Sequence, residues 1–338
     1  MSKNIVICLD GTWNDKDDRR ALSNVVLLHE MCINDGTHQI AYYDKGVGTS
    51  GWYDQKLGGI HGVGLSENIR EAYTYLAQNY RANDRVFIFG FSRGAYTARS
   101  LAGLVYRCGL LPESGQLQSD LENLYDAYKD GEAEKMASYK SANRKCPIEM
   151  LGVWDTVGAL GIPISFFKEA SDKVFGFHDT KLSPEVRLAC HAVAIDEKRA
   201  SFEPTLWEET AENKNRIKRV WFPGVHSDVG GGYPERHHSD VALKWMVDQA
   251  TGRGLLLKEH STYQYQTDLS EDIHASAFKI FGKEIGVEER DASVTSEKKP
   301  KVHRSVREKM KLQQDYKPLA LMKHILDPNT LAPYEVEE

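Results

Sequence analysis

The sequence predicts an α/β fold in which a mostly parallel central sheet is flanked by helices. Two observations lead to this prediction. Short apolar runs that end in glycine or aspartate alternate with segments of helical periodicity, which is the order of elements that builds a parallel sheet. The runs are largely apolar rather than alternating, as strands buried on both faces are. Five runs have this character: residues 5–9, 40–43, 86–89, 148–154 and 220–225.

Apolar residues at helical spacing predict the helices between these runs. One helix is expected to begin near Ser66, a favourable N-cap residue, and a second to follow Ser92 and stop at Gly109. Further helices are expected over residues 184–195 and 239–250.

The chain is expected to form one domain, residues 1–338, with its core in residues 1–255. Residues 113–146 are polar and helical, which indicates either a crossover helix or a helical insertion that would form a small cap. The region 256–338 is charged and without a clear rhythm, so we expect it to be irregular. Its segment 284–311 contains a basic cluster, interpreted as a solvated excursion; attraction to anionic headgroups or phosphorylated substrates is the alternative. The cluster consists of Lys298, Lys299, Lys301, Arg304, Arg307, Lys309 and Lys311.

Composition excludes several classes of function. Hydrophobic residues make up 41% and charged residues 27% of the chain, as in folded soluble proteins. The formal net charge of -6 provides no positive field for nucleic acid. The five cysteines are widely spaced and form no CxxC pair, which argues against a disulfide framework or a thiolate zinc site and favours a reducing compartment.

The apolar runs also bear on location. The run 5–9 is too short for a signal peptide, and no run approaches the ~18 residues of a membrane span, so we expect a cytoplasmic protein. Peripheral membrane contact and export by a dedicated secretion system are both compatible with this pattern. No cofactor is expected, and the sequence does not indicate an oligomeric state.

The segment Gly90-Phe91-Ser92-Arg93-Gly94 stands directly between a predicted strand and a predicted helix. This is the setting of a GxSxG nucleophile elbow, in which a serine occupies a strained turn and glycines allow close backbone packing. The following helix N-terminus favours developing negative charge. The segment therefore predicts an α/β-hydrolase-like fold with Ser92 as nucleophile.

A serine hydroxyl needs a histidine base and an acid that orients it, and in this fold they follow in the order serine, acid, histidine. Asp155 comes directly after the run 148–154, and His226 directly after the run 220–225. Both would lie at the carboxyl edge of the sheet, where ligands bind in such folds. We therefore predict Asp155 and His226 as acid and base. Asp228 is an alternative acid and His303 an alternative base, although no convincing strand precedes His303.

The loop after the first strand is expected to complete the site. Asp10, Gly11 and Thr12 follow residues 5–9, and a glycine at a strand end allows backbone amides to face a substrate oxygen. With the Arg93 amide they would form an oxyanion hole, whose donors are each worth about 3 kcal/mol. Asp10 is expected to order this loop.

Three other functions could be assigned to these residues. An aspartyl phosphatase of the haloacid-dehalogenase type needs an aspartate two positions before Asp10, where Cys8 stands. A metal-dependent hydrolase could use Asp10, Asp155, His226 and Asp228, although their spacing matches no compact metal signature. A non-catalytic binding protein of the same fold is the third. The glycine-rich segment 58–64 matches no phosphate-binding motif and is interpreted as a loop at the pocket rim.

Six motifs together resemble a family of α/β-hydrolase domains, formerly of unknown function, that includes type VI secretion phospholipase effectors. The motifs occupy residues 9–14, 46–49, 89–99, 153–158, 191–197 and 221–232. The resemblance implies a triad of Ser92, Asp155 and His226, an ester or lipid substrate, and phospholipase or lipase activity. Effectors of this family usually carry further membrane-binding regions.

Overall fold

The computed structural model describes residues 2–11, 21–46, 60–157, 181–259, 263–276, 279–280, 283–284, 289–292, 300–322, 324, 325, 327, 329 and 331–338. Within these residues the fold is α/β, with a central sheet of eight strands in the order β10-β9-β6-β5-β4-β3-β1-β2. Every neighbouring pair of strands in this sheet is parallel. The predicted fold class, α/β-hydrolase-like with a mostly parallel sheet, is confirmed.

The described elements have the following bounds. The strands of the central sheet are β1 (Asn4–Leu9), β2 (Gln39–Asp44), β3 (Arg85–Phe91), β4 (Ile148–Trp154), β5 (Ala189–Ala194), β6 (Ile217–Phe222), β9 (Lys301–His303) and β10 (Glu335–Glu337). A separate antiparallel pair consists of β7 (Lys279–Ile280) and β8 (Lys283–Glu284). The helices are α1 (Asn24–Met31), α2 (Ile60–Asn79), α3 (Arg93–Cys108), α4 (Leu117–Lys129), α5 (Ala133–Ala142), α7 (His226–Gly230), α8 (His237–Gly252), α9 (Arg304–Leu312) and α10 (Leu319–Met322), with 3-10 turns η2 (Ala200–Phe202) and η3 (Lys214–Arg216).

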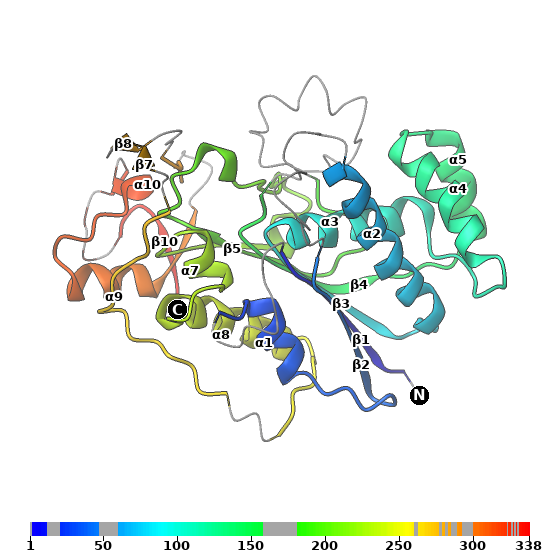
Figure 1. The fold of residues 1–338 in the computed structure, drawn as a ribbon, viewed down its shortest axis with the longest axis horizontal. Coiled ribbons are helices and arrows are strands. Elements are labelled where there is room, and N and C mark those ends of the chain that lie inside the picture. The colour runs from blue at the N-terminus through cyan, green and yellow to red at the C-terminus, as the bar shows by residue number, and fades with distance from the viewer. Residues whose placement is uncertain are drawn as a thin grey trace.

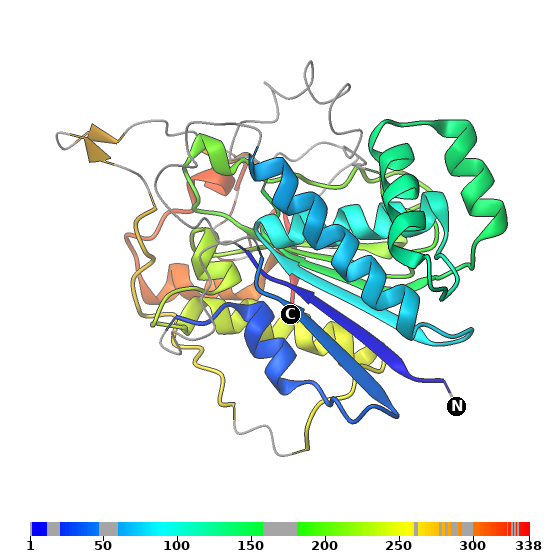
Figure 2. The ribbon, with the colours of Figure 1, turned by 45° about the vertical axis from the view of Figure 1, so that its right-hand side comes forward.

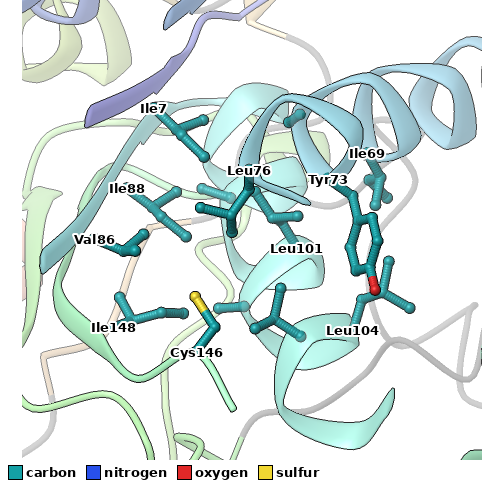
Figure 3. Packing of buried hydrophobic residues seen from close by; sticks show 14 of the residues in the cluster. Ile7, Ile69, Tyr73, Leu76, Val86, Ile88, Leu101, Leu104, Cys146 and Ile148 are labelled. Atoms are coloured by element: carbon teal, nitrogen blue, oxygen red, sulfur yellow. The ribbon is translucent and has the colours of Figure 1, made fainter. Parts of the chain in front are cut away.

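Helices cover both faces of the sheet. Because successive strand residues point to opposite faces, Ile7 of β1 packs under α2 and α3, whereas Val6 packs toward α1 and α8. Figures 1 and 2 show these two pairs of helices on opposite sides of the sheet. Figure 3 shows the first interface, where Ile7 and Ile88 from the sheet meet Leu76 of α2 and Leu101 of α3. The two layers fix the strands whose carboxyl ends carry the candidate site.

The segment 113–146 contains α4 and α5. Their apolar residues join the core beneath α2 and α3, and the Tyr128 hydroxyl donates to the Ser100 carbonyl of α3 at 3.2 Å. In Figure 1 they lie at the right-hand side of the molecule, beside α2. They extend a helical layer of the fold.

One predicted helix is wrong. Residues 184–195, expected to be helical, contain strand β5, whose six residues Ala189–Ala194 are all buried. β5 pairs with β4 on one side and β6 on the other. Its sequence, ACHAVA, is rich in small residues with good helix propensity, and pairing on both edges overrides that local preference.

Two expectations about the start of helix α2 also need correction. α2 begins at Ile60, so Ser66 lies inside the helix and is not its N-cap. Residues 60–64 of the glycine-rich segment are helical rather than a loop, and Gly58 and Gly59 lie outside the described residues.

The region 256–338 was expected to be irregular. Its described residues 263–276 contain no helix or strand, but the structure corrects the expectation from residue 301 onward. β9 and β10 extend the sheet beyond β6, and Val302 and Val306 are buried with Trp221 in a third apolar cluster. Short strands with little apolar periodicity gave no signal for this extension.

The basic cluster is correspondingly part of the folded structure. Lys309 of α9 is fully buried, and its ammonium donates to the carbonyls of Leu269 and Glu271. Arg307 lies 3.6 Å from a carboxylate oxygen of Glu338. Lys301 and Arg304 also face carboxylates, at 3.5 and 3.9 Å, and Lys298 and Lys299 lie outside the described residues. The interpretation as a solvated excursion is therefore wrong for residues 300–312.

Candidate active site

Ser92 occupies a strained turn between β3 and α3. Its φ of 57° and ψ of -121° lie outside the regions that a side chain normally allows. Glycines on both sides make the turn possible. A Cβ on Gly94 would lie 2.1 Å from the Leu9 carbonyl oxygen, and one on Gly90 would lie 2.4 Å from that of Gly94. The turn has the geometry of a nucleophile elbow.

Asp155 follows the last residue of β4 and is completely buried. Its Oδ1 accepts a hydrogen bond from the Ala194 amide at 2.9 Å. The guanidinium of Arg290 approaches both carboxylate oxygens, with Nη1 2.6 Å from Oδ1 and Nη2 3.0 Å from Oδ2. Burial by itself would raise the pKa of Asp155, but the charge of Arg290 and the hydrogen bonds from His226 and Arg290 outweigh it, and the pKa falls well below its usual range. Asp155 is therefore ionised.

His226 is the first residue of α7, just beyond β6, and is also buried. Its Nδ1 lies 2.6 Å from Asp155 Oδ2, so an ionised Asp155 holds a proton on Nδ1 and leaves Nε2 as an acceptor. The rings of Phe91 and Phe202 lie 4.6 and 4.9 Å from the imidazole centroid. The His226 amide donates to Glu197 Oε2 at 3.2 Å. Carboxylate, aromatic walls and backbone together fix the imidazole.

The same contacts bring Ser92 to this edge of the sheet. The Ser92 amide donates to the carbonyl of Trp154, the residue before Asp155, at 3.2 Å. Phe91, the residue before Ser92, packs on the His226 ring, and a Cβ on Gly230 would lie 1.9 Å from the Phe91 ring. Among the described residues, the Ser92 hydroxyl and His226 Nε2 form no hydrogen bond, a contact that is often loose in enzymes without substrate.

The alternative acid and base are engaged elsewhere. Asp228 Oδ1 lies 2.6 Å from Nδ1 of His274, and Asp228 Oδ2 accepts the Val225 amide at 3.0 Å. Burial is the largest influence on Asp228, and its pKa is raised. His303 is the last residue of a strand, β9, but its Nδ1 contacts Ser305 Oγ at 2.8 Å and its ring stacks on Phe222.

The predicted oxyanion hole needs revision. Asp10 accepts hydrogen bonds from the Ser23 hydroxyl at 2.6 Å and the Tyr43 hydroxyl at 2.9 Å, so it orders this region. It also accepts the Gly11 amide at 2.7 Å, which means that this amide is not available to a substrate oxygen. Thr12 lies outside the described residues. The Arg93 amide lies in the first turn of α3 and has no intrahelical acceptor. Of the donors predicted for the oxyanion hole, it is the one that remains among the described residues.

The described residues do not form the metal-binding cluster that was considered as an alternative. No group of three or more histidine, cysteine, aspartate or glutamate side chains in the described part of the chain could hold a metal ion. Asp10, Asp155 and Asp228 instead belong to three separate hydrogen-bond networks.

None of the helices described is both long and apolar enough to span a membrane.

Sequence reasoning missed the second layer of the site. Glu197 lies in one of the recognised motifs, but its contact with the His226 backbone could not be read from spacing. Phe202 and Arg290 lie on segments with no strand or helix periodicity. Asp196, at the end of β5, accepts the Gly224 amide and the Tyr316 hydroxyl, a further link between the site loops and the C-terminal region.

A strained serine after one strand, a buried aspartate after the next and a histidine paired with that aspartate place the chain in the α/β-hydrolase-like class. Residues 3–249 match the family described as T6SS, phospholipase effector Tle1-like, catalytic domain. The chain belongs to this family, and the resemblance seen in the sequence is confirmed. At the level of the family, this supports an ester-cleaving hydrolase activity.

Individual relatives are more distant. The chain is 28% identical over 230 residues to the uncharacterized protein YEL023C of Saccharomyces cerevisiae, covering 60% of this chain and 32% of that protein. An uncharacterized protein from Pseudomonas aeruginosa matches with 20% identity and a TM-score of 0.49, over 76% of this chain and 46% of that one. The Tle1 effector bound to the VgrG spike of the type 6 secretion system matches with 20% identity and a TM-score of 0.41, over 69% and 51%. The chain thus covers 32% of the curated relative and 46% and 51% of the two solved chains.

Proposed function

We propose that this chain hydrolyses carboxylic esters through an acyl-enzyme formed on Ser92. The observation that carries the proposal is the buried 2.6 Å contact between His226 Nδ1 and Asp155 Oδ2, beside a serine held in a strained elbow. In this proposal His226 is the general base and then the general acid, and Asp155 is the acid that orients it.

The reaction has two halves. His226 Nε2 takes the hydroxyl proton as Ser92 Oγ attacks the ester carbonyl carbon, and the Arg93 amide stabilises the negative oxygen. When the tetrahedral species collapses, the C–O bond to the alcohol breaks and Nε2 returns the proton to that alcohol. A water molecule then attacks the acyl-enzyme with the same base, which releases the carboxylic acid and restores Ser92. Asp155 remains ionised throughout and stabilises the imidazolium that forms twice.

The proposed substrate is a lipid ester, with a phospholipid as the first choice, because the matched family is named for phospholipase effectors. Reaching such a substrate requires peripheral contact with a membrane. Delivery by a type VI secretion apparatus, rather than retention in the cytoplasm, is part of the same proposal. Soluble acyl esters are the second choice for the same chemistry.

Labelling with a fluorophosphonate, together with hydrolysis of a short chromogenic ester, tests the mechanism. Ser92→Ala should abolish the labelling and reduce turnover by at least about 1000-fold, because the covalent step is lost. The control is Ser100→Ala, which removes a buried serine hydroxyl farther along the same helix and should label normally. Equal turnover by wild type and Ser92→Ala would contradict the proposal. A panel of phospholipid vesicles that varies headgroup and chain length would then identify the preferred lipid.

A further inference from the structure

Arg290 contacts the candidate acid from a part of the chain that lies beyond the family match, which ends at residue 249. Its side chain is 4% exposed. Besides the two contacts with Asp155, Nη1 donates to the Ala194 carbonyl at 2.7 Å and Nη2 donates to the Phe202 carbonyl at 2.6 Å. One guanidinium therefore ties together the end of β4, the end of β5 and the turn η2.

Each of these contacts affects the geometry around His226. A planar guanidinium that grips both oxygens fixes the rotation of the Asp155 carboxylate, which one hydrogen bond from Ala194 would not do. Oδ2, which faces His226 Nδ1, is thereby held in place. The contact with the Phe202 carbonyl positions the residue whose ring packs edge-on against the imidazole.

We propose that Arg290 is a positioning residue of the active site, which fixes Asp155 and through it His226, so that the catalytic unit extends at least to residue 290. This inference rests on the proposed function, since it assigns Arg290 to the same reaction. It adds that residues 3–249 alone would not form a fully competent site.

The charge of Arg290 has a consequence that a purely structural role would not have. Among the described residues, the charged groups linked to His226 are Asp155 and Arg290, through its ring, and Glu197, which accepts its backbone amide and is paired with Arg199 at 2.9 Å. Asp228, on the same short helix, is paired with His274. The positive charge of Arg290 partly neutralises the negative charge of Asp155. It therefore opposes the formation of a positively charged imidazolium at His226. Removing it should favour the protonated imidazole, which cannot act as a base.

The test compares Arg290→Met and Arg290→Lys with wild type in an ester-hydrolysis assay from pH 5 to 9. Arg290→Met should lower kcat by about 100-fold with little change in KM, because a misplaced base slows the reaction but not binding. The acid limb of its profile should move to higher pH, because Arg290 no longer offsets the charge of Asp155. Arg290→Lys keeps the positive charge but cannot form the bidentate contact with Asp155. The acid limb of its pH profile should therefore stay in place, and its kcat should fall less than that of Arg290→Met.

The matched control is Arg253→Met. Arg253 lies 2.5 Å from the buried Glu149 carboxylate, near the start of the same strand β4 that Asp155 follows. The Arg253→Met variant loses an arginine–carboxylate pair that lies away from the site, and its pH profile should match that of wild type. A folded Arg290→Met enzyme with wild-type kcat and acid limb would overturn the proposal. Should this variant fail to fold, wild-type kcat in Arg290→Lys would overturn it as well.

A readout without substrate separates this inference from the proposed function. The Nδ1 proton of His226 should give a downfield proton resonance, assigned by its loss in His226→Gln. In Arg290→Met this resonance should broaden or shift, and the ring should become protonated at higher pH than in wild type. If wild type shows no ester turnover and this shift occurs, the proposed function fails while the positioning role stands. If wild type turns over esters and the resonance is unchanged in Arg290→Met, the positioning role alone fails.

Discussion

Two aspartate–histidine pairs in this molecule share the same hydrogen bond but not the same surroundings. Asp155 and His226 meet at 2.6 Å, and so do Asp228 and His274, in both cases through Nδ1. The first pair is closed off between aromatic rings and Arg290. In the second, the His274 side chain is 29% exposed, stacks on Tyr233 and has Nε2 3.4 Å from a Glu235 carboxylate oxygen.

The difference lies mainly in what faces the carboxylate. Both aspartates are buried, and burial raises the pKa of a carboxyl group. Arg290 reverses this effect for Asp155, whereas for Asp228 burial prevails and the pKa is raised. A short aspartate–histidine contact is therefore not enough to define an acid–base pair. Position beside the elbow and a cation behind the carboxylate distinguish the candidate triad from a pair that fastens residue 274 to helix α7.

Replacing the two histidines should give the largest contrast. His226→Gln removes the proposed base and should reduce ester turnover by roughly 10⁴-fold or more. His274→Gln keeps a donor toward Asp228, so turnover should stay within about threefold and stability should fall by about 1 kcal/mol. Turnover and urea unfolding of both variants provide the measurement. A large loss of turnover in a stable His274→Gln variant would assign the second pair to the reaction.

Replacing the two aspartates by asparagine should give a smaller contrast. In Asp155→Asn the amide oxygen takes the place of Oδ1, where it accepts from Ala194 and Arg290, and the amide nitrogen takes the place of Oδ2. That nitrogen donates to His226 Nδ1, which forces the ring proton onto Nε2. A base with a proton already on Nε2 cannot accept another, so turnover should fall about 10³- to 10⁴-fold. Asp228→Asn should remain within about threefold of wild type, because it leaves this tautomer unchanged. Comparable turnover by the two variants would remove the distinction between the pairs.

Much of the fold follows from local patterns. The five apolar runs became β1, β2, β3, β4 and β6. In β1, β3, β4 and β6 nearly every residue is buried, and a strand buried on both faces needs apolar residues throughout. β5 was missed because its alanines favour a helix and only its two neighbours make it a strand. β9 and β10 were missed for a related reason. Strands of only three residues carry too few apolar positions to be recognised.

The candidate triad could be proposed from the sequence because each member directly follows an apolar run that the pattern reveals. Asp155 and His226 ranked ahead of Asp228 and His303 because each follows a recognisable apolar run, whereas none was recognised before His303. The supporting groups could not be predicted in the same way. Arg290 reaches Asp155 across 135 positions of sequence from a segment with no strand or helix assigned, and no local pattern marks such a contact. Burial and charge balance reveal it only once the structure is known.

The smallest expected effect is a difference in how the two aspartates contribute to stability as pH changes. Asp155 has a lowered pKa in the folded protein, so its contribution is complete above the ordinary carboxyl range near pH 4 and declines as the pH falls. Asp228 has a raised pKa, so its contribution is complete below that range and is lost as the pH rises through the raised value. The destabilisation caused by Asp155→Asn should therefore grow between pH 3.5 and 7, while that caused by Asp228→Asn should shrink. Urea unfolding of both variants and wild type across this interval measures the two trends, and parallel trends would mean that Arg290 does not set the two carboxylates apart.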